Sequence, residues 1–322
     1  MLTPPTPRPA GKEASLSCCN ARIGFFGVAA LVLLRITIGW HLLYEGLHKL
    51  NQEEFSAEGY LSQAAGPFQK FFQYTVIQDF EGRDRLSTPW NDAQIDDYYA
   101  RFQAQFGLDA TQKQTAERIV AARKKNIADY LTNADNAKLI ADNQAAWKKL
   151  NDEKAAYQSH GGAAPFQDRR LWEATQTLRS DVRPAIVWVK QQHDGLKNDL
   201  KNLLPRAERR DVTYPLSEQL RNPDRLVTYA CIAMGACLMV GLFSRLAAFG
   251  GAVFLAMIVA SRLQWTGYYM PPTHPAQGNS LFVTKEFIEM MCCIVLMTLP
   301  VGRWGGLDFI VHNTVGRVFS RD

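Results

Sequence analysis

Ionisable side chains occur in two strongly apolar stretches of this sequence, where a charge needs a specific reason to be present. His41, Glu45 and His48 are spaced i, i+4 and i+7, so on a helix they share one face, and Lys49 follows Glu45 at i+4. Lys285 and Glu289 repeat this spacing further along the chain. Each Glu–Lys couple can pair within its own helix, and the two couples can also pair across helices. The pattern predicts either a structural clamp or a functional pocket, because ionisable groups inside a membrane are candidates for function.

Two other chemistries involve the same stretch. Glu45 and His48 have the Glu-x-x-His spacing of di-iron helical bundles, but such sites need a second copy of the motif, which this sequence lacks. We therefore predict no metal site. Aromatic side chains near His41 could line a flat slot for a quinone headgroup, or they could be anchors at the membrane interface: Trp40, Tyr44 and Trp265.

Arg35 interrupts the first apolar stretch and has to be accommodated there. An arginine at the centre of a membrane helix costs about 2.5–3.5 kcal/mol on insertion scales. We expect Arg35 to face the interior of a helical bundle, to have a partner, and to be structural. Four cysteines in the apolar stretches are expected to be small packing residues: Cys231, Cys237, Cys292 and Cys293.

The apolar residues are segregated into four stretches, and the first is long enough to cross a hydrocarbon core of ~30 Å. They are residues 23–44, 226–243, 246–262 and 282–301. Only Ser244 and Arg245 separate the second from the third, which requires an antiparallel hairpin. The sequence predicts an all-α protein, a four-helix transmembrane bundle with an extracytoplasmic helical insert between helices one and two.

Basic residues in short segments predict the orientation, because such residues remain in the cytoplasm. They lie before the first stretch, between the second and third, and after the fourth: Arg8, Lys12, Arg22, Arg245, Arg303, Arg317 and Arg321. Four crossings place all three regions on one side. Residues 1–22 and 302–322 are then cytoplasmic tails, and the insert faces outward.

The insert occupies residues 80–225 and is polar and mostly helical by pattern. Before it, residues 55–78 form two short amphipathic pieces on the membrane surface, broken at Gly66-Pro67 and grouped with the first span as a unit of residues 23–79. Helical spacing continues from 92 to 204, with an interruption at Gly161-Gly162 and a kink or split at Pro184.

Charge and motifs exclude several functions for the insert. The whole chain has a net charge of +5, its basic residues are interleaved with acidic ones, and it has no nucleic-acid-binding pattern. No nucleic-acid partner is therefore predicted. The insert holds no CxxC, glycine-rich phosphate loop or nucleophile motif. We interpret it as a module that covers the membrane part or docks a protein partner.

Three motifs follow one another along the apolar parts of the chain. The first helix contains Arg35, Gly39, Gly46 and Lys49, and Gly59-Tyr60-Leu61 with Gly66-Pro67 come in the segment after it. The last helix opens with a third run: Asn279, Phe282, Val283, Lys285, Ile288 and Glu289. In this order the motifs resemble those of the DoxX/DoxD-like family of membrane proteins. The resemblance covers about 23–75 and 226–301, and the insert departs from it. It implies a compact four-helix membrane protein. Together with the orientation predicted from the basic residues, we expect a protein of the bacterial cytoplasmic (inner) membrane with the insert facing the periplasm or exterior.

Some proteins of that family are the small subunit of a thiosulfate:quinone oxidoreductase, and this suggests the first functional hypothesis. The chain would be an accessory or subunit of a quinone-linked redox system, with quinone as the one candidate cofactor. Its binding residues would be Trp40, His41, Tyr44, Glu45, Lys49, Trp265, Lys285 and Glu289. The alternative is a non-catalytic membrane scaffold or assembly protein whose insert docks a partner. A transporter is disfavoured, because neither an inverted repeat nor a pair of broken helices is evident.

Overall fold

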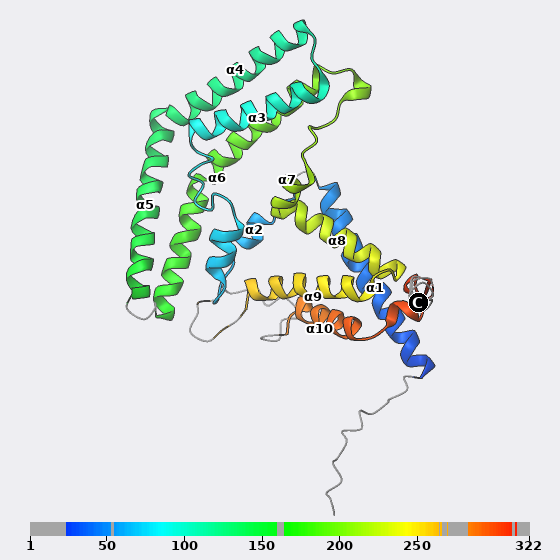
Figure 1. The fold of residues 1–322 in the computed structure, drawn as a ribbon. Coiled ribbons are helices and arrows are strands. Elements are labelled where there is room, and N and C mark those ends of the chain that lie inside the picture. The colour runs from blue at the N-terminus through cyan, green and yellow to red at the C-terminus, as the bar shows by residue number, and fades with distance from the viewer. Residues whose placement is uncertain are drawn as a thin grey trace, which may run out of the picture.

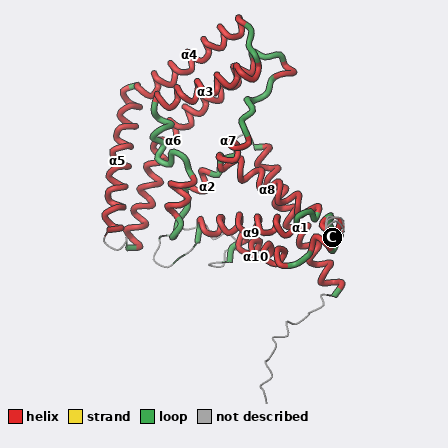
Figure 2. The backbone as a smooth tube through the Cα atoms, in the orientation of Figure 1, coloured by secondary structure: helices red, strands yellow, loops and turns green. Residues whose placement is uncertain are grey.

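A computed structural model of the 322-residue chain describes residues 24–52, 55–159, 164–263, 265, 269, 283–310 and 313. Throughout these residues the regular elements are helices, and none is a strand (Figure 2). The predicted all-α class is therefore confirmed. The predicted tail 1–22 lies outside the described residues. Of the predicted tail 302–322, residues 311, 312 and 314–322 also lie outside them.

Three helices in the described part of the chain are long and apolar enough to cross a membrane: α1 (Phe25–Asn51), α8 (Pro223–Val240) and α9 (Ser244–Ser261). The fourth predicted stretch, 282–301, contains α10 (Lys285–Thr298), which has 14 residues. A helix of that length spans about 21 Å, less than a hydrocarbon core of ~30 Å. The helix at 282–301 is thus present, but its length alone does not make it a span.

Helix α1 packs against α8, and α9 packs against α10, with further contacts between α8 and α9 and between α1 and α10 (Figure 1). Glycine permits the close approach of α1 and α8, because a Cβ on Gly235 of α8 would meet the backbone of Leu43 in α1. Small residues at helix contacts are typical of membrane bundles. The four helices share one core, which includes Ile38, Leu42, Leu238, Leu255, Cys293 and Leu296.

The joint between α8 and α9 is the antiparallel hairpin that the sequence predicts. Gly241 ends α8 with a positive φ of 73°, and Phe243 follows with a φ of 49°. The Asp308 carboxylate accepts hydrogen bonds from the backbone N–H groups of Phe243 at 2.6 Å and Ser244 at 3.0 Å. A segment after α10 thus caps the start of α9 and holds the turn.

Helix α1 continues to Asn51, seven residues beyond the predicted end of the apolar stretch at 44. Hydropathy falls there because Glu45, His48 and Lys49 are polar, but none of them breaks a helix. The Glu45–Lys49 ion pair at i,i+4 stabilises this last part of α1.

Four long helices form the insert, and they have hydrophobic cores of their own. They are α3 (Thr88–Phe106), α4 (Ala110–Thr132), α5 (Ala134–Ser159) and α6 (Pro165–Asn202). The larger core includes Ile95, Phe102, Ile127, Leu196 and Leu200, and all its buried members lie between 86 and 212. The buried residues of a second core are Ile77, Phe80, Trp147, Leu150 and Leu171.

The sequence predicts a kink or a split at Pro184, and α6 runs through this residue without a split. In Figure 1 the first part of α6 lies beside α5, and its later part turns to lie beside α4. His193 in the later part also contacts Asn91 of α3 at 2.7 Å. Proline in a helix removes one hydrogen bond and bends the axis, whereas packing on both sides keeps the helix continuous.

The segment between α1 and α3 contains α2 (Glu58–Leu61) and the π-helix η1 (Phe71–Val76). Gly66, with a φ of 79°, separates the two pieces, as predicted. Gln73 of η1 is fully buried, and its amide donates to the Ser62 and Ala64 carbonyls of the same segment at 3.1 and 3.0 Å. The segment joins the insert to the ends of the membrane helices.

Candidate functional site

The first candidate site lies where α1 meets the start of α10. His41 Nε2 is 3.4 Å from Glu289 Oε1, and Lys285 Nζ is 3.3 Å from His41 Nε2. Lys285 Nζ is also 3.6 Å from Glu289 Oε1. Three ionisable groups from two helices are therefore in mutual contact. The lysine ammonium can donate to the carboxylate and to an unprotonated imidazole nitrogen at the same time.

Glu45 and Lys49 form a separate pair within α1, at 2.6 Å between Nζ and Oε2. The sequence predicts a direct contact between Glu45 and Lys285, and no ion pair joins them. The contact between α1 and α10 is made by His41 instead. Each lysine pairs with the glutamate at i,i+4 on its own helix, so neither glutamate needs a lysine from the other helix.

Each of these five side chains therefore has a partner: His41, Lys285 and Glu289 contact one another across the two helices, and Glu45 pairs with Lys49 within α1. Glu289 is largely shielded, with a side chain 15 % exposed, whereas Lys285 is 65 % exposed and reaches solvent. Charges paired in this way are poorly available to a ligand. The arrangement favours the clamp interpretation, in which the cluster holds α10 against α1.

The predicted aromatic slot is only partly assembled. Trp40 and Tyr44 are 56 % and 57 % exposed, and their ring centroids lie 6.4 Å apart along the outer face of α1. Tyr44 also stacks on His48 at 6.3 Å. Trp265 is exposed beyond the end of α9, and no ring contact between it and Trp40 or Tyr44 occurs among the described residues.

Arg35 is 1 % exposed and lies in the interior of the protein, as expected from the energetic cost of placing an arginine charge against lipid. Its guanidinium donates to the backbone carbonyls of Val301 at 3.3 Å and Gly305 at 2.9 Å. A Cβ added at Gly241 or Gly306 would meet this guanidinium, so the glycines leave space for it. Arg35 therefore ties the segment after α10 to the middle of α1, which is a structural role.

Metal-ligating residues do not gather in the described residues, where no group of three or more His, Cys, Asp or Glu side chains could hold an ion. His48 stacks on Tyr44 and contacts Gln52 at 2.8 Å. Cys231 and Cys293 are buried in the helix packing, and Cys237 and Cys292 are half-buried. All four are free thiols.

A second polar centre, which the sequence interpretation missed, lies at Glu58 of α2. Its carboxylate accepts two hydrogen bonds from Arg85, both at 3.1 Å, and one from Arg179 of α6 at 2.9 Å. Burial opposes the charge of Arg85, but the hydrogen bonds and charges of Glu58 and Asp79 together outweigh it, and the pKa of Arg85 is raised. The one signal in the sequence was the neighbouring Gly59-Tyr60-Leu61 motif.

Tyr60 extends this centre to the membrane helices. Its hydroxyl donates to the Ile258 carbonyl of α9 at 3.2 Å and accepts from the Ser261 hydroxyl at 3.0 Å. The backbone N–H of Ala57 donates to Asp224 of α8 at 2.6 Å. The α2 segment therefore connects α6 of the insert to the ends of α8 and α9.

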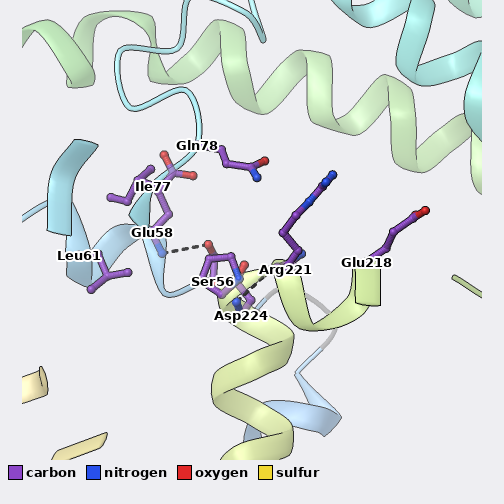
Figure 3. A pocket seen from close by; sticks show the side chains of 10 residues that line it. Ser56, Glu58, Leu61, Ile77, Gln78, Glu218, Arg221 and Asp224 are labelled. Atoms are coloured by element: carbon purple, nitrogen blue, oxygen red, sulfur yellow. Dashed lines mark hydrogen bonds between the residues drawn. The ribbon is translucent and has the colours of Figure 1, made fainter. Parts of the chain in front are cut away.

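A groove of about 1460 Å³ opens beside this centre, between α6 and the corner formed by α7 (Leu216–Arg221) and α8. A smaller pocket of about 250 Å³ shares Glu58, Glu218, Arg221 and Asp224 with it (Figure 3). Both are lined mainly by polar and charged side chains.

Comparison with known proteins gives no family assignment. No family model, curated protein or solved structure matches this chain. The resemblance to the DoxX/DoxD-like family therefore depends on the motif residues alone. Of these, Asn279 and Phe282 lie outside the described residues.

Proposed function

We propose that this chain is an integral membrane accessory protein of the non-catalytic scaffold kind, whose helical insert docks a protein partner outside the bilayer. The observation that carries this proposal is the insert itself. It has its own cores, it is connected to α8 and α9 through the α2 segment, and it presents a large charged groove. The charges on α1 and α10, in contrast, are paired with one another.

The proposed topology has four crossings, with α10 as the fourth, and both chain ends in the cytoplasm. Exposed apolar side chains on all four helices support contact with lipid: Leu33, Leu47, Tyr229, Val240, Phe249, Val253, Ile288, Met291 and Val295. Arg245 at the α8–α9 joint and Arg303 after α10 belong to the same end of the bundle, opposite the insert. Following the positive-inside rule, we place the protein in a bacterial cytoplasmic membrane with the insert outward.

A quinone-linked redox subunit of the DoxX/DoxD-like kind is the second candidate. It is favoured by one observation, the exposure of Trp40 and Tyr44 on α1 next to His41, which is itself one-third exposed. An apolar ring could lie on this surface from the lipid side. No complete cofactor motif accompanies it.

Gentle detergent extraction from membranes of the organism that encodes the chain separates the two candidates. We expect a protein partner in fixed stoichiometry and no stoichiometric quinone, measured by mass spectrometry and by extraction of lipids. Quinone in a one-to-one ratio that is lost in Trp40→Leu with His41→Leu would instead support the redox subunit. Absence of any fixed-stoichiometry protein would refute the scaffold proposal.

A further inference from the structure

Every acidic side chain that lines the groove between α6 and the α7–α8 corner has a partner. Glu58 binds two arginines, and Glu81, Asp194, Asp211 and Glu218 each form an ion pair. Asp224 accepts the Ala57 N–H. Five of these six acids are therefore paired with an arginine or lysine of the protein, and Asp224 accepts a backbone hydrogen bond.

Several basic side chains of the same groove are not compensated. Among the described residues no carboxylate pairs with Arg183 or Lys190 of α6, nor with Arg221 of α7. Figure 3 shows the Arg221 side chain extending away from Asp224. The Arg225 guanidinium lies 5.7 Å from the centroid of the Tyr214 ring rather than beside an acid. Unpaired positive charge thus stands on two walls of the groove.

The α6 wall has an amphipathic pattern. Arg183, Ile186, Val187 and Lys190 are spaced i, i+3, i+4 and i+7, so they lie on one face of the helix. Val187 is 43 % exposed although it is apolar. Arg183 and Lys190 are separated by about 10 Å along the axis. The wall therefore presents an apolar centre with a cation at each end.

We infer that this groove receives an acidic amphipathic helix of the docked partner, with apolar side chains on Val187 and carboxylates facing Arg183, Lys190 and Arg221. The inference rests on the proposed scaffold function and names the partner's chemistry. A volume of about 1460 Å³ exceeds the ~300–1,000 Å³ typical of small-molecule sites. Cations on two walls fit an occupant that reaches both, as a helix laid in a groove does.

The test uses the full-length chain in membranes of its own host, with a photo-crosslinking amino acid at position 187 and peptide-level mapping of the adduct. We expect an adduct with a protein segment that carries Asp or Glu at helical spacing. Its yield should fall at least tenfold in R183E/K190E and in R221E. The matched control K148E/K149E changes exposed lysines of α5 by the same charge and should leave the yield unchanged.

Other results overturn the inference. They are an adduct with lipid, an adduct with a neutral or basic segment, and a yield that the groove and control variants affect equally. Circular dichroism of each variant checks that the insert is folded, and R183Q/K190Q replaces R183E/K190E where it is not. A partner that co-purifies in fixed stoichiometry but cross-links only from a probe at Gln144 on α5 removes the inference while the scaffold function stands. If the chain binds no protein at all, both this inference and the proposed scaffold function are wrong.

Discussion

Glu289 of α10 lies 3.4 Å from His41 of α1, and this contact joins the shortest of the four apolar helices to the longest. Lys285 contacts both groups, so the histidine and the carboxylate are held by one ammonium. The Glu45–Lys49 pair lies one turn further along α1. These contacts link α10 to α1, and mutation can test whether they act as a structural clamp.

Glu289→Gln should lower the thermal stability of the detergent-solubilised protein and leave the content of bound ligand unchanged. The change removes the carboxylate that faces both His41 and Lys285, and we expect a loss of about 1 kcal/mol in the free energy of unfolding. Glu286→Gln is the matched control, because Glu286 is on the same turn and forms no ion pair in the described part of the chain. Equal melting temperatures for wild type and Glu289→Gln would contradict the clamp.

Glu58→Gln should loosen the insert from the membrane helices. The substitution removes the charge that Arg85 and Arg179 share, and breaking such a partly buried network costs roughly 1–3 kcal/mol, below the cost for a fully buried pair. We expect faster hydrogen exchange in α2 and in residues 79–87, with α4 unchanged. Glu208→Gln, on an exposed residue, is the control. Unaltered exchange at α2 would show that Glu58 does not connect the two parts.

The positions of the long helices were predictable from the sequence because they depend on local patterns. Helices α8 and α9 begin and end within a few residues of the apolar stretches, and the burial of Arg35 followed from the energetic cost of its charge. The insert's helices also followed from spacing, although α3 begins at Thr88 rather than near 92. Pro89 is compatible with the start of α3, because backbone N–H groups in the first turn of a helix have no hydrogen-bond acceptor within the helix.

Pairings between distant residues were not predictable in the same way. Glu45 and Lys285 have opposite charges and similar depth, which suggested a contact, but each has a nearer partner on its own helix. Arg85 and Arg179 are 27 and 121 residues from Glu58, and nothing in their neighbourhoods indicates that they converge. The groove likewise arises from the placement of α6 relative to α7, which is a property of the whole fold.

Side-specific labelling tests the orientation. A cysteine introduced at Gln144, on the exposed surface of α5, should react with a membrane-impermeant maleimide added from outside. A cysteine at Thr314, which lies outside the described residues, should react only after the membrane is opened. The native cysteines are replaced by serine or alanine first, and an open-membrane sample controls for reactivity. The opposite labelling pattern would invert the topology.

An isolated insert should fold if the fragment includes the residues that complete its cores. Residues 91–204 lack Ile77, Phe80, Leu86 and Val212, all of which are buried in the full chain. Residues 77–214 restore them. We expect both fragments to be helical by circular dichroism, and the longer one to unfold at a higher urea concentration with a sharper transition. Equal midpoints would mean that the flanking residues pack only when the membrane helices are present.

Lys154 gives the insert a specific dependence on pH. Burial, opposed by the charge of Glu81, lowers the pKa of Lys154 from 10.5 to about 8. The ammonium lies 5.9 Å from the Trp147 ring and donates to the Thr175 hydroxyl at 2.9 Å. Between pH 8 and 10.5, Lys154 is therefore protonated in the unfolded chain but mostly deprotonated in the folded chain. Because the unfolded state binds more protons, the free energy of unfolding rises with pH in that interval.

The 77–214 fragment allows this effect to be measured by urea unfolding between pH 7.5 and 9.5. We expect the free energy of unfolding to increase by about 2 kcal/mol over this range, since each pH unit contributes at most ~1.36 kcal/mol per proton. Lys154→Met keeps the side-chain volume, removes the titration and should remove the slope. The range stops at pH 9.5 because Tyr98, which the fragment contains and whose pKa is raised by burial, would reverse the trend above pH 10. A slope that persists in Lys154→Met would assign the effect to another group.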